Sequence, residues 1–413
     1  MPECKIKELP SLLSEALGEE IEVLEEKSKF LTPPGEHYGS IMLSLDVVIR
    51  RSASGKSETL NLVAKMPPAS EMLKTCFDIG VTFKKELDSY AIMIPALQEF
   101  QRDYNVPEER IIDIFPKYYG GRINLNGSDV VDDDALLLFE NLKVKGYDTE
   151  DRFIGFDLES AQMIVQDLAK FHAIPIAMRI LRPNDFKEKV GPTIVPNSGI
   201  ETLPEEVGSA FVDSVIEVSK TIPELANYLT KIQENVRIAE ENAANKNIPP
   251  PNPIYATAAH SDYWVNNTMI KKDPKTGKIV SNKMVDLQIM QYNSALVDLV
   301  FFLFTSVVNE VLDVHCDALI KLYYDTFIEY LKDFKVDLAP YNWSDFLQEV
   351  DSCAHAEFYH VAFMLKPIFT EKGKINNLAE FQPSDWGRRD LIGDAHRDKL
   401  RKTMLAYAKR NWL

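Results

Sequence analysis

The chain has 413 residues, 45% of them hydrophobic and 26% charged, which is typical of a globular protein large enough for two or three lobes with their own cores. Its formal net charge of −17, with no run rich in lysine and arginine, argues against nucleic acid and anionic membranes as partners. The most apolar run, 295–308, contains Asp298 and is too short to span a bilayer, and the first 20 residues do not resemble a signal peptide.

Residues 1–30 are predicted to form one or two short helices, around Leu12, Leu17 and Val23–Leu24. From Gly39 the hydrophobic period becomes two, which predicts a strand. One face of this strand would carry Ile41, Leu43, Leu45, Val47 and Ile49. After a turn at 52–56, a second strand has Leu60, Leu62, Ala64 and Met66 on one face. Lys65 therefore points to the face opposite the core stripe.

A helix predicted over 83–97 carries a carboxylate on its apolar side. Its stripe at helical spacing consists of Phe83, Leu87, Tyr90, Ile94 and Leu97. Glu86 lies against this stripe, and a carboxylate turned inward needs a cation because desolvation without a partner is costly. Lys65 is the natural candidate. The alternative is that Glu86 reaches solvent and Lys65 is an ordinary surface lysine.

The segments 111–119 and 135–139 are predicted strands, joined by a turn at 124–134 that is rich in Gly, Asn and Asp. The sequence Glu140-Asn141-Leu142 follows the second strand. A strand that leaves a sheet between two lobes can hold an adenine through its main-chain groups. We place the lobe boundary here, with an N-lobe at 1–142 and a C-lobe at 143–413.

A clear helical period begins near Phe156 and continues through Ala173. We interpret His172 on this helix as a packed, hydrogen-bonded side chain rather than a catalyst or ligand. Residues 176–250 are expected to form helical segments broken by prolines, with the longest polar-faced helix at 222–245.

The apolar run 254–259 leads into the loop His260-Ser261-Asp262-Tyr263-Trp264-Val265-Asn266-Asn267. Asp262 and Asn267 have the D-x-x-x-x-N spacing of kinase catalytic loops, with a histidine two places before the aspartate. Strands at 267–270 and 279–287, joined by a strong turn signal, would bring Asn267 and Asp286 to the same end of a hairpin. Phosphoryl transfer requires a carboxylate that accepts a proton, and an amide oxygen and a second carboxylate that bind Mg²⁺. These residues therefore indicate a phosphotransferase centre.

Apolar helices follow residue 294, with further helices expected at 318–334, 343–369 and 394–412. The simplest interpretation of Asp298 is a solvent-facing residue near a helix start, where the helix dipole favours a negative charge. Aromatic groups at 301–304 and 358–363 could line a substrate pocket, although such stripes usually pack in the core.

Taken in order, these motifs resemble the ecdysteroid kinase-like proteins of arthropods, within the wider group of choline kinases and aminoglycoside phosphotransferases. The resemblance covers nearly the whole chain, in the segments 35–40, 63–65, 138–142, 168–173, 260–267, 285–288 and 298–303 together with Glu86. It implies an α+β, bilobal protein-kinase-like fold, with a small antiparallel-sheet N-lobe and a larger, mainly helical C-lobe. Ser261 stands where the related enzymes usually have glycine, and Asn141 where they often have aspartate.

The resemblance implies how ATP would be bound. Lys65 would contact the phosphates and Glu86 would hold Lys65 in place. Gly39 and Ser40 belong to the segment that would cover the phosphates, although this segment lacks the G-x-G-x-x-G of protein kinases. The adenine would be held by the backbone of Glu140, Asn141 and Leu142.

The resemblance also implies the roles of the residues near the acceptor. Asp262 would be the catalytic base, while Asn267 and Asp286 would carry Mg²⁺. His260 and Asp298 would support the catalytic loop without touching substrate.

We therefore expect ATP- and Mg²⁺-dependent phosphorylation of a hydroxyl on a small, lipophilic metabolite, such as an ecdysteroid or a xenobiotic in detoxification. The alternatives are a choline- or ethanolamine-like amino-alcohol kinase and a ligand-binding pseudokinase. The pseudokinase is disfavoured because the chain retains the polar residues that catalysis would need, which are Lys65, Glu86, Asp262, Asn267 and Asp286. Asp286-Leu287-Gln288 is not D-F-G and no A-P-E motif is present, which disfavours a protein kinase. The expected partner is a small-molecule hydroxyl acceptor, and nothing indicates an obligate protein partner. Four widely spaced cysteines indicate reduced thiols in the cytoplasm.

Overall fold

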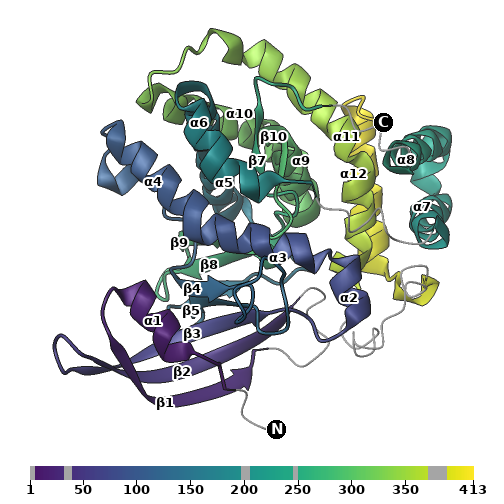
Figure 1. Ribbon diagram of the computed structural model, residues 1–413. Coiled ribbons are helices and arrows are strands. Elements are labelled where there is room, and N and C mark those ends of the chain that lie inside the picture. The colour runs from purple at the N-terminus through teal and green to yellow at the C-terminus, as the bar shows by residue number, and fades with distance from the viewer. Residues whose placement is uncertain (1–4, 32–39, 197–204, 245–249, 371–387) are drawn as a thin grey trace.

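An antiparallel sheet of five strands lies at one end of the computed structural model, and helices make up most of the rest (Figure 1). The structure describes residues 5–31, 40–196, 205–244, 250–370 and 388–413. The strands are β1 (Ile21–Phe30), β2 (Ile41–Arg51), β3 (Ser57–Met66), β4 (Tyr118–Arg122), β5 (Leu136–Glu140), β6 (Tyr147–Thr149), β7 (Ala256–Ala259), β8 (Thr268–Lys272), β9 (Ile279–Met284) and β10 (Gln291–Ser294).

The α-helices are α1 (Leu9–Leu17), α2 (Glu71–Cys76), α3 (Ile79–Asp88), α4 (Ile94–Asp103), α5 (Leu158–Leu181), α6 (Pro183–Asp185), α7 (Glu205–Lys220), α8 (Leu229–Ala244), α9 (Ala295–Ser306), α10 (Asn309–Asp333), α11 (Trp343–Phe369) and α12 (Asp394–Lys409). The shorter 3₁₀ and π turns are η1 (Ser89–Met93), η2 (Glu108–Arg110), η3 (Phe186–Val190), η4 (Gly191–Ile194), η6 (Pro223–Tyr228), η7 (Val265–Asn267), η8 (Ala339–Tyr341) and η11 (Arg389–Leu391). This composition confirms the expected α+β class, with a small antiparallel sheet and a larger, mainly helical part.

The five-stranded sheet has the order β1-β2-β3-β5-β4, and its two faces pack in different cores. One face packs with α1 in a small core that contains the alternate residues expected from β2 and β3, such as Leu45 and Leu62. Strand alternation turns Lys65 to the opposite face, where it pairs in register with Met42 and Leu137. Leu137 belongs to the large core of the helical part. The strand predicted after Gly39 and the strand predicted after the turn at 52–56 are thus confirmed as β2 and β3.

The helix predicted over 83–97 is present but longer. α3, η1 and α4 follow one another from Ile79 to Asp103, with a π turn at Ser89–Met93 in the middle. Phe83 and Tyr90 of the predicted stripe are buried in the large core. Figure 1 shows this helical run between the sheet and the other helices, so one side of the run faces the sheet that contains β3.

The helix predicted around Val23–Leu24 is wrong, because these residues belong to edge strand β1. Val23 pairs with Ile49 of β2, and Ile21 is buried beside the small core. The glutamates of this segment favour a helix intrinsically, but pairing along β2 and burial of alternate apolar residues override that preference.

The strand predicted over 111–119 is only partly right, since β4 begins at Tyr118. Most of the preceding residues, such as Ile112 and Phe115, are buried, but they form no strand. Gln101 accepts from the N–H of Ile112 at 2.9 Å, and Gln98 donates to the carbonyl of Ile112 at 2.9 Å. Helix side chains satisfy the main chain here, which a hydrophobic pattern does not reveal.

Two small sheets lie within the helical part, one with the order β6-β8-β9 and one pairing β7 with β10. β8 and β9 confirm the predicted hairpin, although β9 ends at Met284 rather than at residue 287. The helix predicted over 222–245 begins as the 3₁₀ turn η6 and continues as α8, and Asn245 lies outside the described residues. None of the described helices combines the length and hydropathy needed to cross a membrane.

His396 on α12 is 3% exposed, and within the described ranges neither ring nitrogen has a hydrogen-bond partner. Burial, with help from Lys366 and Arg397, lowers its pKa to about 4. The unfolded chain protonates a histidine near pH 6.5. It therefore binds more protons than the folded protein between pH 6.5 and 4, and stability is lost as the pH falls through this window.

When the pH falls from 7.5 to 5, we expect the free energy of unfolding to drop by about 2 kcal/mol less in His396→Phe than in the parent protein. The phenylalanine ring cannot take up a proton when the chain unfolds. Urea unfolding at the two pH values measures this difference. Exposed His355 on α11, changed in the same way, is the control. An unaltered pH dependence in the His396 variant would contradict the assignment.

Candidate active site

Lys65 is a buried lysine held by two carboxylates. Its Nζ lies 2.5 Å from Glu86 Oε2 and 2.8 Å from Asp286 Oδ1. Burial opposes the charge on Lys65, but Asp286 and Glu86 outweigh this effect and raise its pKa above the usual value. Burial raises the pKa of Glu86, and the Lys65 ammonium opposes that rise. The expected pairing is present, and the alternative that Glu86 reaches solvent is wrong, because its side chain is 1% exposed.

Glu86 faces inward because of its place on α3. It is three residues after Phe83 and four before Tyr90, both of which are buried in the large core. Residues at this spacing share one face of a helix. The same periodicity that builds the core therefore directs the carboxylate to the sheet face that carries Lys65.

Asp286 reaches Lys65 from the exit of the β8–β9 hairpin. The N–H of Val285 donates to the carbonyl of Asn267 at 3.1 Å, which fixes the exit of the hairpin against its entrance. Asp286 has a φ of 68°, a left-handed conformation that is uncommon for a residue other than glycine. Its side chain remains 30% exposed. Strained backbone of this kind is often kept at functional sites, because it aims a particular side chain.

Asp262 and Asn267 are joined within the loop. Nδ2 of Asn267 donates to the Asp262 carboxylate at 3.0 Å and to its carbonyl at 2.8 Å. Burial and the nearby charge of Asp286 raise the pKa of Asp262 to about 7, although His360, Asn267 and Trp264 oppose the rise. The structure thus brings Asp262, Asn267, Asp286 and Lys65 together.

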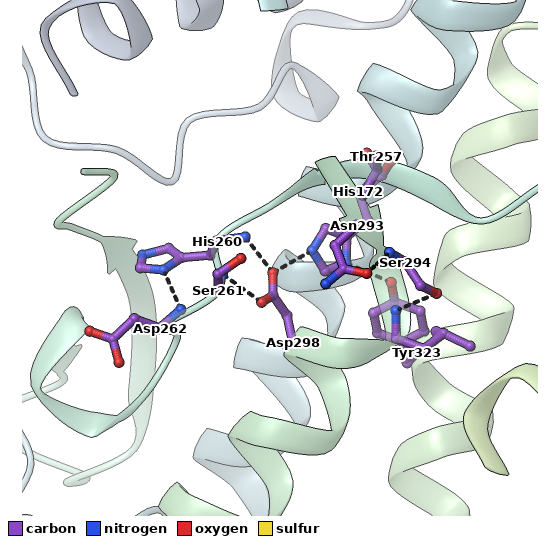
Figure 2. A network of polar contacts seen from close by, with 10 residues as sticks. His172, Thr257, His260, Ser261, Asp262, Asn293, Ser294, Asp298 and Tyr323 are labelled. Carbon is purple, nitrogen blue, oxygen red and sulfur yellow. Dashed lines mark hydrogen bonds and ion pairs between the residues drawn. The ribbon is translucent and has the colours of Figure 1, made fainter. Parts of the chain in front are cut away.

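Asp298 fixes the start of this loop from a buried position on α9. Its Oδ2 accepts from the N–H of His260 at 2.6 Å, and its Oδ1 from the N–H of Ser261 at 2.8 Å. His172 Nε2 lies 2.9 Å from Oδ2, and Tyr323 bonds the other ring nitrogen of His172 at 2.7 Å. Figure 2 shows this network, with the Asp262 carboxylate turned away from it.

The interpretation of Asp298 as a solvent-facing residue is therefore wrong, because the side chain is fully buried. Burial alone would raise its pKa, but the hydrogen bond and charge of His172, with His260, lower the pKa below the usual value. The expectation that His172 is a packed, hydrogen-bonded residue is confirmed. His260 also contacts the hairpin, since its Nε2 donates to the carbonyl of Val285 at 3.0 Å.

Ser261 has a φ of 65°, the left-handed conformation that glycine adopts without strain. This geometry explains why glycine suits the position. The hydrogen bond from its N–H to Asp298 helps to hold the serine in that conformation.

Replacing Asp298 with alanine should lower the free energy of unfolding by about 3 kcal/mol, because two loop N–H groups and a histidine lose their buried acceptor. Urea denaturation measures the change. Asp313→Ala, at an exposed position on α10, is the matched control and should change stability by less than about 0.5 kcal/mol. Equal stability of the two variants would contradict the role given to Asp298.

The hinge residues predicted to hold adenine lie at the exit of β5. The N–H of Glu140 donates to the carbonyl of Lys117 at 2.9 Å, and the N–H of Asn141 to the carbonyl of Asn61 at 2.9 Å. The Asn141 side chain also bonds the buried Ser44 hydroxyl at 3.2 Å. Within the part of the chain that the structure describes, the N–H of Leu142 has no hydrogen-bond partner. Of the three predicted residues, Leu142 therefore offers the available donor.

Gly39 lies outside the described residues, as does most of the segment predicted to cover the phosphates. Ser40 is described and directly precedes β2. Because Met42 pairs with Lys65, Ser40 lies at the Lys65 end of the sheet.

His360 was not among the predicted site residues, although its charge and the charge of Asp262 influence each other. Its i, i+3 spacing from Glu357 on α11 was a detectable signal. Nothing in the sequence shows that this face of α11 lies near residues 260–267.

A sequence model of the ecdysteroid kinase-like family matches residues 34–336. No curated protein matches the chain. Among solved structures, an ethanolamine kinase from Plasmodium vivax shows 11% identity and a TM-score of 0.39, covering 94% of this chain and 84% of that one. A spectinomycin phosphotransferase in complex with ADP and spectinomycin shows 11% identity and a TM-score of 0.39, with 99% of each chain covered. The GDP complex of aminoglycoside 2′-phosphotransferase-IIIa shows 12% identity and a TM-score of 0.40, with 97% of each chain covered.

Proposed function

Because the chain belongs to the ecdysteroid kinase-like family, we propose that it transfers the γ-phosphoryl group of ATP, with Mg²⁺, to a hydroxyl of a small, lipophilic molecule such as an ecdysteroid or a xenobiotic. The observation that carries the proposal is the 2.8 Å contact between Lys65 and Asp286, which are 221 residues apart in the chain. This contact joins the sheet to the hairpin that also carries Asn267. A lysine that could bind phosphates therefore lies beside the carboxylate and amide groups that could bind a metal ion and accept a proton.

In this proposal Lys65 binds the phosphates of ATP and Glu86 keeps its ammonium group in position. A lysine held by a helix carboxylate supplies a fixed positive charge to the phosphates. The N–H of Leu142 would hold the adenine, with Glu140 and Asn141 shaping the hinge. Gly39 and Ser40 would lie over the phosphates.

The residues present fit a magnesium ion. Nδ2 of Asn267 faces Asp262, which leaves its Oδ1 as a ligand, and Asp286 offers a partly exposed carboxylate. Among the described residues no group of three or more His, Cys, Asp or Glu is arranged for a metal. Mg²⁺ commonly takes only one or two protein ligands and completes its shell with substrate phosphates and water. When bound, Mg²⁺ draws charge off the phosphates.

Asp262 acts as the base in this scheme. The acceptor hydroxyl oxygen bonds to the γ-phosphorus, the bond to the bridging oxygen of ADP breaks, and the hydroxyl proton passes to the Asp262 carboxylate. Asn267 holds that carboxylate, while Asp298 and His260 fix the backbone on either side of Ser261. Placement of the two reactants, together with charge neutralisation, would provide most of the rate acceleration.

We also propose a cytoplasmic location and a boundary between lobes after Leu142. Within the described ranges Cys76, Cys316 and Cys353 are free thiols, which a reducing compartment maintains. The boundary is supported by the change of sheet, since β5 belongs to the five-stranded sheet and β6 pairs with β8.

The test is incubation of the protein with γ-labelled ATP and a panel of hydroxylated steroids, amines and plant phenolics, with and without Mg²⁺. We expect a labelled steroid or phenol that forms only when Mg²⁺ is present. Labelling of choline or ethanolamine instead would identify an amino-alcohol kinase. ATP binding without transfer to any acceptor would identify a pseudokinase.

A further inference from the structure

A small cavity lies where α7, α11 and α12 pack against one another, at one side of the helical part (Figure 1). Its volume is about 10 Å³, which is the room that a single occupant of the size of water needs. The polar residues that line it are Ser214 of α7, Lys366 of α11 and His396 of α12. The other lining residues, such as Val215 and Leu400, are apolar, so no carboxylate lines the cavity.

His396 brings two buried polar atoms without a partner to this cavity. Its side chain is 3% exposed, and in the described parts of the chain neither ring nitrogen makes a hydrogen bond. A neutral imidazole always carries one N–H donor, whichever tautomer is present. Buried polar atoms normally have a partner in the protein or in a bound water or ion. The cavity is therefore the place where the missing partner of His396 can sit.

Positive charge surrounds this position. Lys366 is 6% exposed, and its Nζ donates to Oγ of Ser214 at 3.3 Å. Burial lowers the pKa of Lys366 to about 8, so the ammonium form still predominates at neutral pH. Burial also lowers the pKa of His396, and the charges of Lys366 and Arg397 lower it further, so both cations act on the ring. His396 lies in the first turn of α12, at the positive end of the helix dipole.

The carboxylates of this region do not face the cavity. The side chain of Asp394, in the first turn of α12, is fully exposed and lies 3.8 Å from Arg397. Asp390 acts on the charge of Lys366, but its Oδ2 accepts from Arg388 at 2.6 Å and it is not among the lining residues. The cavity thus combines hydrogen-bond donors with a positive surrounding charge.

We propose that this cavity binds one monatomic anion of the size of chloride, which accepts hydrogen bonds from a ring N–H of His396 and from the ammonium group of Lys366. The small volume excludes polyatomic anions such as sulfate and phosphate. A water molecule can also bond the ring, but only an anion gains from the positive charge of Lys366, Arg397 and the start of α12. The inference is independent of the proposed function, because none of these residues belongs to the candidate active site.

The first test compares thermal unfolding in sodium chloride and in sodium gluconate at equal ionic strength. An ion that binds only the folded protein raises the unfolding midpoint, by about 1.5 °C for each tenfold increase in chloride above the dissociation constant in a chain of this length. His396→Phe, which puts an apolar ring into the cavity, and Lys366→Met should each abolish this rise. His355→Phe, at an exposed position of α11, is the control and should keep it. The response to chloride is compared within each variant, so a less stable variant still reports on binding.

Chloride should also reduce the pH dependence of stability, which a bound water would not do. With the cavity empty, the pKa of His396 is about 4. A bound anion favours the protonated ring and brings this pKa nearer to the value of about 6.5 that the unfolded chain has. The parent protein should therefore lose less stability between pH 7.5 and pH 5 in chloride than in gluconate. His396→Phe should show no such difference between the two salts.

A crystal soaked in sodium bromide shows the site directly, because anomalous scattering locates the bromide ion. We expect a peak within hydrogen-bond distance of a ring nitrogen of His396. No peak in this cavity, or a chloride response in His396→Phe equal to that of the parent protein, would overturn the inference.

Discussion

Asp262→Asn is expected to reduce phosphate transfer by about 10³-fold or more while leaving the fold intact. A positioned general base contributes about 10²–10⁴-fold, and an amide cannot accept the hydroxyl proton. The asparagine keeps the shape of the side chain and can still accept the hydrogen bond from Asn267. The measurement is the rate of transfer from γ-labelled ATP to the acceptor found by the panel.

Asp313→Asn on α10 is the control for this variant, since it makes the same change of charge at an exposed position. Thermal unfolding of both variants checks that folding is preserved. Parent-like activity in Asp262→Asn would remove Asp262 from the mechanism.

Asp286→Ala is expected to weaken Mg·ATP binding by about 100-fold and to abolish transfer. The substitution removes a proposed ligand of Mg²⁺, and it also removes one of the two carboxylates that hold Lys65. Glu86 remains to pair with the buried ammonium, so the protein should still fold. A lost carboxylate ligand weakens the metal directly, because Mg²⁺ is held by few protein oxygens.

Calorimetric titration with ATP, with and without Mg²⁺, measures this effect. Asp148→Ala, on an exposed position of neighbouring strand β6, is the control and should bind Mg·ATP as the parent does. If Asp286→Ala binds Mg·ATP as tightly as the parent, the metal assignment is wrong.

Periodicity explains why the Lys65–Glu86 pair could be predicted from the sequence. A period of two placed Lys65 opposite the core face of β3, and a period near 3.6 placed Glu86 among the apolar residues of α3. The hairpin signal likewise brought Asn267 and Asp286 to one end. In each case the local pattern fixes the direction of the side chain relative to a buried face.

Other features depend on packing between distant elements. The sequence allows Asp298 to be either exposed or buried, and only the position of α9 behind the loop makes it the acceptor for Ser261. The left-handed backbone at Ser261 and Asp286 is likewise not predicted by a hydrophobic pattern. The nearness of His360 to Asp262 depends on how α11 packs on α9, which no local pattern states.

The most direct measurement is a crystal structure of the protein with Mg²⁺ and a non-hydrolysable ATP analogue. We predict that the phosphates of the analogue contact Lys65 and that Mg²⁺ is bound by Asn267 and Asp286. The adenine should accept a hydrogen bond from the N–H of Leu142. A nucleotide bound elsewhere, or an ion that touches neither Asn267 nor Asp286, would contradict the account.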